Sequence, residues 1–176
     1  LLWQDYRDNK IVKEELRLKR FDETLKYFAV NDKQLSHDIG EYYILASPKQ
    51  TALLPYTIEV LTYLHAKYQL HIISNGFEEV QFIKLKSANI LKYFNQVILS
   101  EKVGVKKPHP LIFKRALQLT KAATYNSLMI GDDWYADIYG AQRANIDAVY
   151  FNPNKIVHHH KVEQEISCLK ELIKLL

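Results

Sequence analysis

The stretch "LMIGDDWYADIYGA", residues 128–141, places three aspartates within six positions directly after an apolar run. Carboxylates that lie so close repel one another, so such a cluster needs a cation or extensive hydration. If a helix begins near Trp134, Asp133 and Asp137 share one of its faces, and Asp132 lies at the tip of the preceding strand. A few oxygen ligands that stay open to substrate suit Mg²⁺. The alternative is that Asp132 or Asp133 only caps the helix and that Asp137 faces solvent.

Three other apolar runs resemble the run that precedes this cluster. All are short, and segments with helical spacing of apolar residues separate them. Short apolar runs that alternate with amphipathic helices are typical of parallel strands buried on both faces. We therefore predict an α/β fold, a Rossmann-like, doubly wound parallel sheet. Its strands are expected within residues 69–74, 96–100, 127–131 and 147–151.

The first part of the chain is predicted to be helical. Its apolar stripe comprises Ile11, Leu16, Phe21, Leu25 and Phe28. Asn31 or Asp32 can cap the helix that follows. The segment "ASPKQ", residues 46–50, breaks this pattern, so we place a helical appendage at residues 1–50 and the α/β core at residues 51–176. A closing helix is expected to bury Val162, Ile166, Leu169, Ile173 and Leu176.

Polar groups follow two of the other predicted strands. After "HIIS" come Asn75 and Gly76, and together with Ser74 this turn can offer a phosphate one hydroxyl and several backbone N–H groups. After "QVILS" the chain reaches Lys107, which Pro108 restricts to an extended conformation, so its side chain is directed. In isolation the first feature is an ordinary capped turn and the second a surface lysine. Because ligands bind beyond the carboxyl ends of parallel strands, a hydroxyl, a lysine and a carboxylate cluster should converge on one crevice suited to phosphoryl transfer.

Composition limits the classes of partner. The 176 residues are 48% hydrophobic and carry a formal charge of +4 without a strong basic block, which makes nucleic acid a weak candidate and small anions fair ones. The single cysteine excludes an intrachain disulfide or a CxxC metal site. No apolar run approaches the roughly 18 to 20 residues that cross a bilayer, and the first residues do not form a signal peptide. We expect a cytoplasmic protein without membrane or nucleic-acid partners.

The order of these motifs resembles the haloacid dehalogenase-like hydrolase superfamily. "HIISNGF", "SEKVGVKKPHPLIF" and "LMIGDDWYADIYGA" are similar to its second, third and fourth motifs, and "LLWQDYRDNKIVKEELRLKRF" resembles the helical cap of its pyrimidine and noncanonical 5′-nucleotidase branch. The resemblance implies a Mg²⁺-dependent phosphatase for a small phosphorylated substrate. A nucleoside monophosphate is the first candidate substrate, and a sugar phosphate is the second. By position, Ser74 would bind the phosphoryl group on a loop shaped by Asn75 and Gly76, and Lys107 would neutralise the phosphate and the nucleophile.

The same resemblance assigns the acidic residues. Asp132 would hold Mg²⁺ directly, and Asp137 would support the metal or orient Lys107. Asp133 stands where relatives often carry serine or threonine, so its role is open.

One part of the family pattern is missing. Members attack phosphate with an aspartate of a DxDxT motif on the first core strand, forming an aspartyl-phosphate, and no such motif occurs here. In the family this strand lies centrally, between those that correspond to "HIIS" and "LMIG". We therefore expect that the first core strand and the nucleophile are absent from this chain, that the cap is partial, and that the chain alone is inactive. A separate N-terminal fragment, another chain or a homo-oligomer would complete the sheet.

Other interpretations remain open. A metal-independent dehalogenase would not need the acidic fourth motif, and a receiver-type signalling domain has these groups in the reverse order. A non-catalytic module could keep the phosphate crevice without the nucleophile. Trp134 and Tyr135 could touch substrate, whereas the run from His158 to His160 is expected to be a solvated loop.

Overall fold

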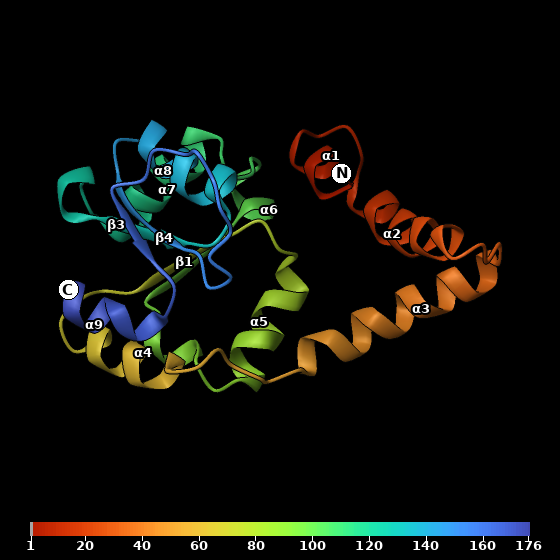
Figure 1. Ribbon diagram of the computed structural model, residues 1–176, viewed down its shortest axis with the longest axis horizontal. Helices are drawn as coiled ribbons and strands as arrows, with labels where there is room; N and C mark the ends of the chain where they lie inside the picture. The colour runs from red at the N-terminus through yellow and green to blue at the C-terminus, as the bar shows by residue number, and fades with distance from the viewer. Residues whose placement is uncertain (1) are drawn as a thin grey trace.

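The computed structural model describes residues 2–176, which form a projecting helical segment and an α/β part (Figure 1). The helical segment contains α1 (Leu2–Arg7), α2 (Lys13–Tyr27) and α3 (Lys33–Ala46), and α2 packs along α3. Asp32 caps α3 by accepting a hydrogen bond from the backbone of Leu35, as predicted. Phe28, expected on the apolar stripe, is instead 68% exposed because it lies beyond the end of α2.

A single-turn 3₁₀ helix, η1 (Ser47–Lys49), leads into the α/β part. Its helices and strands alternate along the chain. They are α4 (Thr57–His65), β1 (His71–Ser74), α5 (Glu78–Ser87), η2 (Leu91–Tyr93), β2 (Gln96–Leu99), α6 (Ser100–Val103), α7 (Pro110–Thr120), η3 (Thr124–Asn126), β3 (Leu128–Gly131), η4 (Trp134–Tyr139), α8 (Gly140–Arg143), β4 (Asp147–Phe151), β5 (Gln164–Ile166), η5 (Leu169–Glu171) and α9 (Leu172–Leu175). None of the helices within residues 2–176 is long and apolar enough to cross a membrane.

The strands form two parallel groups. β1 pairs with β2, and β3 pairs with β4, which pairs with β5. All four strands expected from the apolar runs are present, and the doubly wound α/β prediction is confirmed. β1 and β3 are not hydrogen-bonded to each other, so each has one edge without a strand partner among the described residues.

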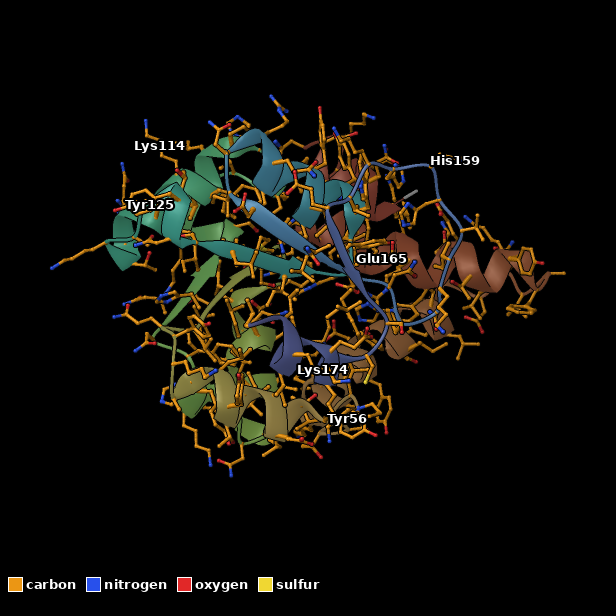
Figure 2. All side chains as sticks on the ribbon, turned by 60° about the vertical axis from the view of Figure 1, so that its left-hand side comes forward. Tyr56, Lys114, Tyr125, His159, Glu165 and Lys174 are labelled. Carbon is orange, nitrogen blue, oxygen red and sulfur yellow. The ribbon has the colours of Figure 1, made fainter. Side chains whose placement is uncertain are left out.

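The two groups nevertheless belong to one layer. One apolar core, with Phe113 of α7 at its centre, packs against Ile73 of β1 and Met129 of β3. The other core, which includes Val60 of α4, packs against Ile130 on the second face. Figure 2 shows the two helix layers on opposite sides, one marked by Lys114 and Tyr125 and the other by Tyr56 and Lys174. Because the core around Phe113 contacts strands of both groups, we infer that they are two halves of one sheet.

The predicted closing helix is wrong over its first part. Gln164 to Ile166 form β5, which pairs with β4, and only Leu172–Leu175 are α-helical at the end of the chain. Ile166 is buried in the core that contains Val60, so strand pairing and burial override a local pattern that favours a helix.

Candidate active site

The candidate site lies where β1 and β3 end. Asn75, directly after β1, is hydrogen-bonded twice to the backbone of Lys107: its amide nitrogen donates to the Lys107 carbonyl at 3.0 Å, and its oxygen accepts from the Lys107 N–H at 2.8 Å. This pair of bonds fixes the loop after α6 against the end of β1. The Ser74 hydroxyl oxygen accepts the Gly76 N–H at 3.0 Å, which orients the side chain within the same turn.

Lys107 is a buried cation. It is 9% exposed, and its ammonium donates to Asp137 Oδ1 at 2.6 Å and to the Ile73 carbonyl at 2.8 Å. The alternative of a surface lysine is therefore wrong. Because Ile73 belongs to β1 and Asp137 follows β3, Lys107 links the ends of the two strand groups. The Lys107–Pro108 peptide bond is cis.

The turn after β3 depends on two aspartates that the sequence singled out. Asp133 caps the single π-helical turn η4, because its Oδ1 accepts the Ala136 N–H at 2.9 Å. Asp137, 4% exposed, folds back so that its Oδ2 accepts the Asp133 N–H at 3.2 Å. A Cβ at Gly131 would lie 2.4 Å from the Asp137 Cβ and Oδ2, so this fold-back requires glycine. The alternative that Asp137 faces solvent is wrong.

Two cationic side chains of the same chain offset the repulsion between these carboxylates. Lys107 pairs with Asp137, and Arg7 of α1 pairs with the Asp133 Oδ2. Asp132 is exposed at the tip of β3. Within residues 2–176, no three His, Cys, Asp or Glu side chains are grouped so as to hold a metal ion. A single available carboxylate still fits Mg²⁺, which commonly takes one or two carboxylates together with water and substrate phosphate.

Sequence reasoning missed the contribution of the helical segment. Arg7 is 126 positions away from Asp133, and Lys106 donates to Asn9 Oδ1 at 2.6 Å with its ammonium 4.1 Å from the centre of the Tyr6 ring. Burial lowers the pKa of Lys106. No local pattern marks such contacts, because their partners lie on different parts of the chain.

Aromatic side chains gather around the turn after β3. Trp134 stacks on His160, with ring centres 3.6 Å apart, and His158 is 3.1 Å from a Glu165 oxygen. The expected solvated loop is thus partly packed against the site: His158 is half-buried, and His160 covers Trp134. Tyr135 remains exposed.

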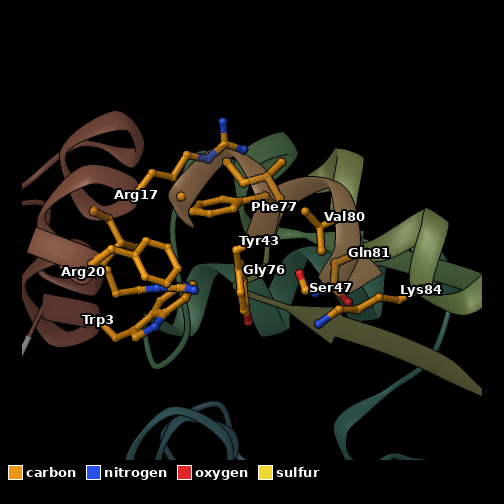
Figure 3. A pocket seen from close by; sticks show the side chains of 14 residues that line it. Trp3, Arg17, Arg20, Tyr43, Ser47, Gly76, Phe77, Val80, Gln81 and Lys84 are labelled. Atoms are coloured by element: carbon orange, nitrogen blue, oxygen red, sulfur yellow. The ribbon is translucent and has the colours of Figure 1, made fainter. Parts of the chain in front are cut away.

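A cavity of about 100 Å³ separates the helical segment from α5 (Figure 3). Figure 3 shows Trp3 and Arg20 on one side, Lys84 on the other, and Tyr43 between them. Gly76 also lines this cavity, so the cavity lies next to the turn that contains Ser74.

Comparisons with known proteins identify similar chains. The family model described as haloacid dehalogenase-like hydrolase covers residues 11–151. Pyrimidine 5′-nucleotidase PynA of Streptococcus pneumoniae is 30% identical over 92% of this chain and 68% of its own length. Pyrimidine 5′-nucleotidase YjjG of Escherichia coli is 30% identical over 99% of this chain and 77% of its own length.

A solved structure shares the fold. The magnesium-bound crystal structure of the HAD-hydrolase YfnB from Bacillus subtilis superposes with a TM-score of 0.89 at 24% identity, covering 99% of this chain and 76% of that one. The family match spans most of the chain, and two relatives at 30% identity cover nearly all of it. The chain therefore belongs to the haloacid dehalogenase-like hydrolase family, as its motifs predicted.

Proposed function

We propose that the complete protein is a Mg²⁺-dependent phosphohydrolase that acts through an aspartyl-phosphate intermediate. Its substrate would be a small phosphorylated metabolite, and a nucleoside monophosphate is the first candidate. The observation that carries this proposal is the buried Lys107, fixed by Asp137 and Ile73 where β1 and β3 end. A fixed ammonium at this point favours a phosphate brought to the same crevice. The relatives named as pyrimidine 5′-nucleotidases support the choice of substrate.

The roles of the residues follow from their contacts. The Ser74 hydroxyl and the backbone after it would bind phosphate oxygens, while Asn75 holds the Lys107 loop in place. Asp137 would orient Lys107, because one of its oxygens accepts the ammonium directly. Asp132 would hold Mg²⁺, which supplies charge neutralisation for the transferring phosphoryl group.

Asp133 has less capacity to bind metal than the sequence predicted. One of its oxygens accepts from Ala136 and the other is paired with Arg7. A metal ligand at this position would have to give up the ion pair with the cap.

We further propose that the nucleophile comes from a strand that fills the gap between β1 and β3. Two parallel strands with free edges, both in contact with the core around Phe113, suit a third parallel strand that hydrogen-bonds to both. A carboxylate at the carboxyl end of this strand would face Lys107. We expect the strand to come from an N-terminal segment, supplied as part of the same protein, as a separate fragment or by a second copy.

The non-phosphate part of the substrate would enter the cavity of Figure 3. The partly exposed aromatic rings of Trp3 and Tyr43 offer flat apolar surfaces, and Gly76 connects the cavity with the phosphate turn. A nucleobase fits this combination better than a small sugar, because its flat ring can stack. We expect the reaction in the cytoplasm, where such metabolites occur.

The test is reconstitution. Residues 1–176 are mixed with a peptide that carries an apolar strand ending in DxDxT, and phosphate release from uridine monophosphate is measured with Mg²⁺ and with a chelator. We expect activity only with both peptide and Mg²⁺, and none with a peptide whose first aspartate is replaced by asparagine. Turnover by residues 1–176 alone would contradict the missing nucleophile, and an inert reconstituted protein that binds the peptide would contradict the phosphatase.

Two alternatives are decided by further measurements on the same reconstituted protein. Halide release from a 2-haloacid that persists with the chelator would identify a metal-independent dehalogenase. Phosphate binding without turnover, even after the strand is supplied, would identify a non-catalytic phosphate-binding module. The acidic turn formed by Asp132, Asp133 and Asp137 favours the phosphatase, because halide displacement does not need it.

A further inference from the structure

Asp133 is the part of the acidic turn whose role the sequence left open. Its carboxylate has two different partners: Oδ1 accepts the Ala136 N–H inside the core, and Oδ2 pairs with Arg7 on α1. The side chains of Arg7 and Asp133 are 21% and 43% exposed, so the pair is partly shielded from solvent. The residue therefore belongs to the core through one oxygen and to the helical segment through the other.

The contacts of Asp133 continue into the site. Its own N–H donates to Asp137 Oδ2, and Asp137 Oδ1 accepts the Lys107 ammonium. A continuous polar chain thus runs from Arg7 through Asp133 and Asp137 to Lys107. If α1 moves away, Arg7 leaves Asp133, and the first link of this chain is lost.

A second polar contact closes the same edge of the site. Lys106, the neighbour of Lys107, donates to Asn9 Oδ1 and lies over the Tyr6 ring. Both contacts connect α1 and the loop after it with turns of the core, one after β3 and the other after α6. Their common position suggests a latch for the cap, meaning the helical segment of residues 2–46.

We propose that Asp133 is a positioning residue that holds the cap closed through Arg7 and couples this closure to the Lys107–Asp137 pair. Closure has an apolar part as well, because Trp3 and Tyr6 pack against Phe77 of the core. Apolar contacts are not directional, so they hold α1 near the core without fixing its register. The ion pair fixes the register, because it is directional and joins Arg7 of α1 to Asp133 of the core across their boundary.

Hydrogen–deuterium exchange on residues 1–176 tests the proposal without any need for catalysis. Asp133→Asn keeps an oxygen that can cap η4 but removes the charge that attracts Arg7. Arg7→Met removes the positive charge that α1 contributes to the same ion pair. We expect each variant to speed exchange of the α1 amides by about two- to fivefold, the range for a partly exposed ion pair.

Two comparisons separate the latch from a local capping role. Arg7→Met changes no core residue, yet it should also speed exchange in η4, because Asp133 loses its partner; a purely capping Asp133 would leave η4 unaffected. Arg7→Lys, which keeps the charge, should restore most of the protection. The double variant Arg7→Met/Asp133→Asn should exchange no faster at α1 than either single variant, because the two substitutions remove the same ion pair.

The control is Asp22→Asn, which breaks an ion pair with Lys26 within α2 and should leave α1 unchanged. Unchanged α1 exchange in both single variants would overturn the proposal, and so would additive effects in the double variant. If Asp133→Asn lowers the global stability, Arg7→Met decides the question alone. Failure of the phosphatase proposal would not affect these outcomes, since none of them depends on turnover.

Discussion

Lys107→Met gives the most direct measure of how the site is held together. Methionine keeps the unbranched stem of lysine but removes the ammonium that Asp137 Oδ1 and the Ile73 carbonyl accept at 2.6 and 2.8 Å. Asp137 would then be a buried carboxylate, 4% exposed, without its cation. Breaking a buried ion pair by removing one partner costs about 3–5 kcal/mol.

The lower end of this range applies here. Asp137 keeps the hydrogen bond from the Asp133 N–H at 3.2 Å, which offsets part of the loss. We therefore expect the free energy of unfolding to fall by about 3 kcal/mol, a large share of the 5–15 kcal/mol typical of a folded protein. For a chain of this length the corresponding loss in Tm is about 6–12 °C.

Urea unfolding followed by circular dichroism at neutral pH measures this loss. Asp137→Asn should also destabilise, because it leaves the ammonium buried without its carboxylate. The double variant Lys107→Met/Asp137→Asn should lose less than the sum of the single variants, by at least about 1 kcal/mol. Lys26→Met removes a more exposed ion pair and should change stability by less than about 1 kcal/mol.

A loss below about 1 kcal/mol for Lys107→Met would refute this reasoning, and so would strict additivity in the double variant. Either result would mean that Lys107 is solvated and not fixed between β1 and η4. The phosphate-binding role proposed for it would then lose its structural basis.

Three further outcomes follow from the same structure. Gly131→Ala should destabilise by about 1–3 kcal/mol in urea unfolding, because its Cβ would lie 2.4 Å from Asp137. Gly40→Ala in α3 should stabilise by up to about 1 kcal/mol, since the nearest side-chain atom, in Phe21, is 3.5 Å away. Burial alone would raise the pKa of Glu79, but hydrogen bonds led by that from Lys13 outweigh it and hold the pKa below 4.5. Glu79 therefore stabilises the contact between cap and core fully above pH 4.5, and this stabilisation is lost as the pH falls through the folded-state pKa of Glu79. Hydrogen exchange of the α2 amides should follow this loss, and Glu79→Gln should abolish the pH dependence.

The strands β1 to β4 could be predicted because each is marked locally. A run such as residues 128–131 is apolar, short and bounded by turn residues, so its type does not depend on distant contacts. The meeting of Lys107 and Asp137 near the end of β1 followed from the rule that parallel strands end at one edge. The fixed position of Lys107 was predicted from Pro108, although the sequence did not show that Asn75 would hold its backbone.

What could not be predicted depends on partners far away along the chain. Residues 164–166 carry two long polar side chains and one isoleucine, a pattern that also suits a helix, and only the free edge of β4 makes them a strand. The pairing of Arg7 with Asp133 has the same character, because nothing near either residue specifies the other.

The acidic turn shows how the two kinds of information combine. Repulsion among its aspartates predicted a cation, and a shared metal ion was expected in that role. In the structure, Lys107 and Arg7 neutralise Asp137 and Asp133. The turn therefore has electrostatic partners within the protein itself, and a metal is not needed to explain why these two carboxylates lie close together. Asp132, exposed at the strand tip, is then the carboxylate most free to interact with a ligand that the rest of the site attracts.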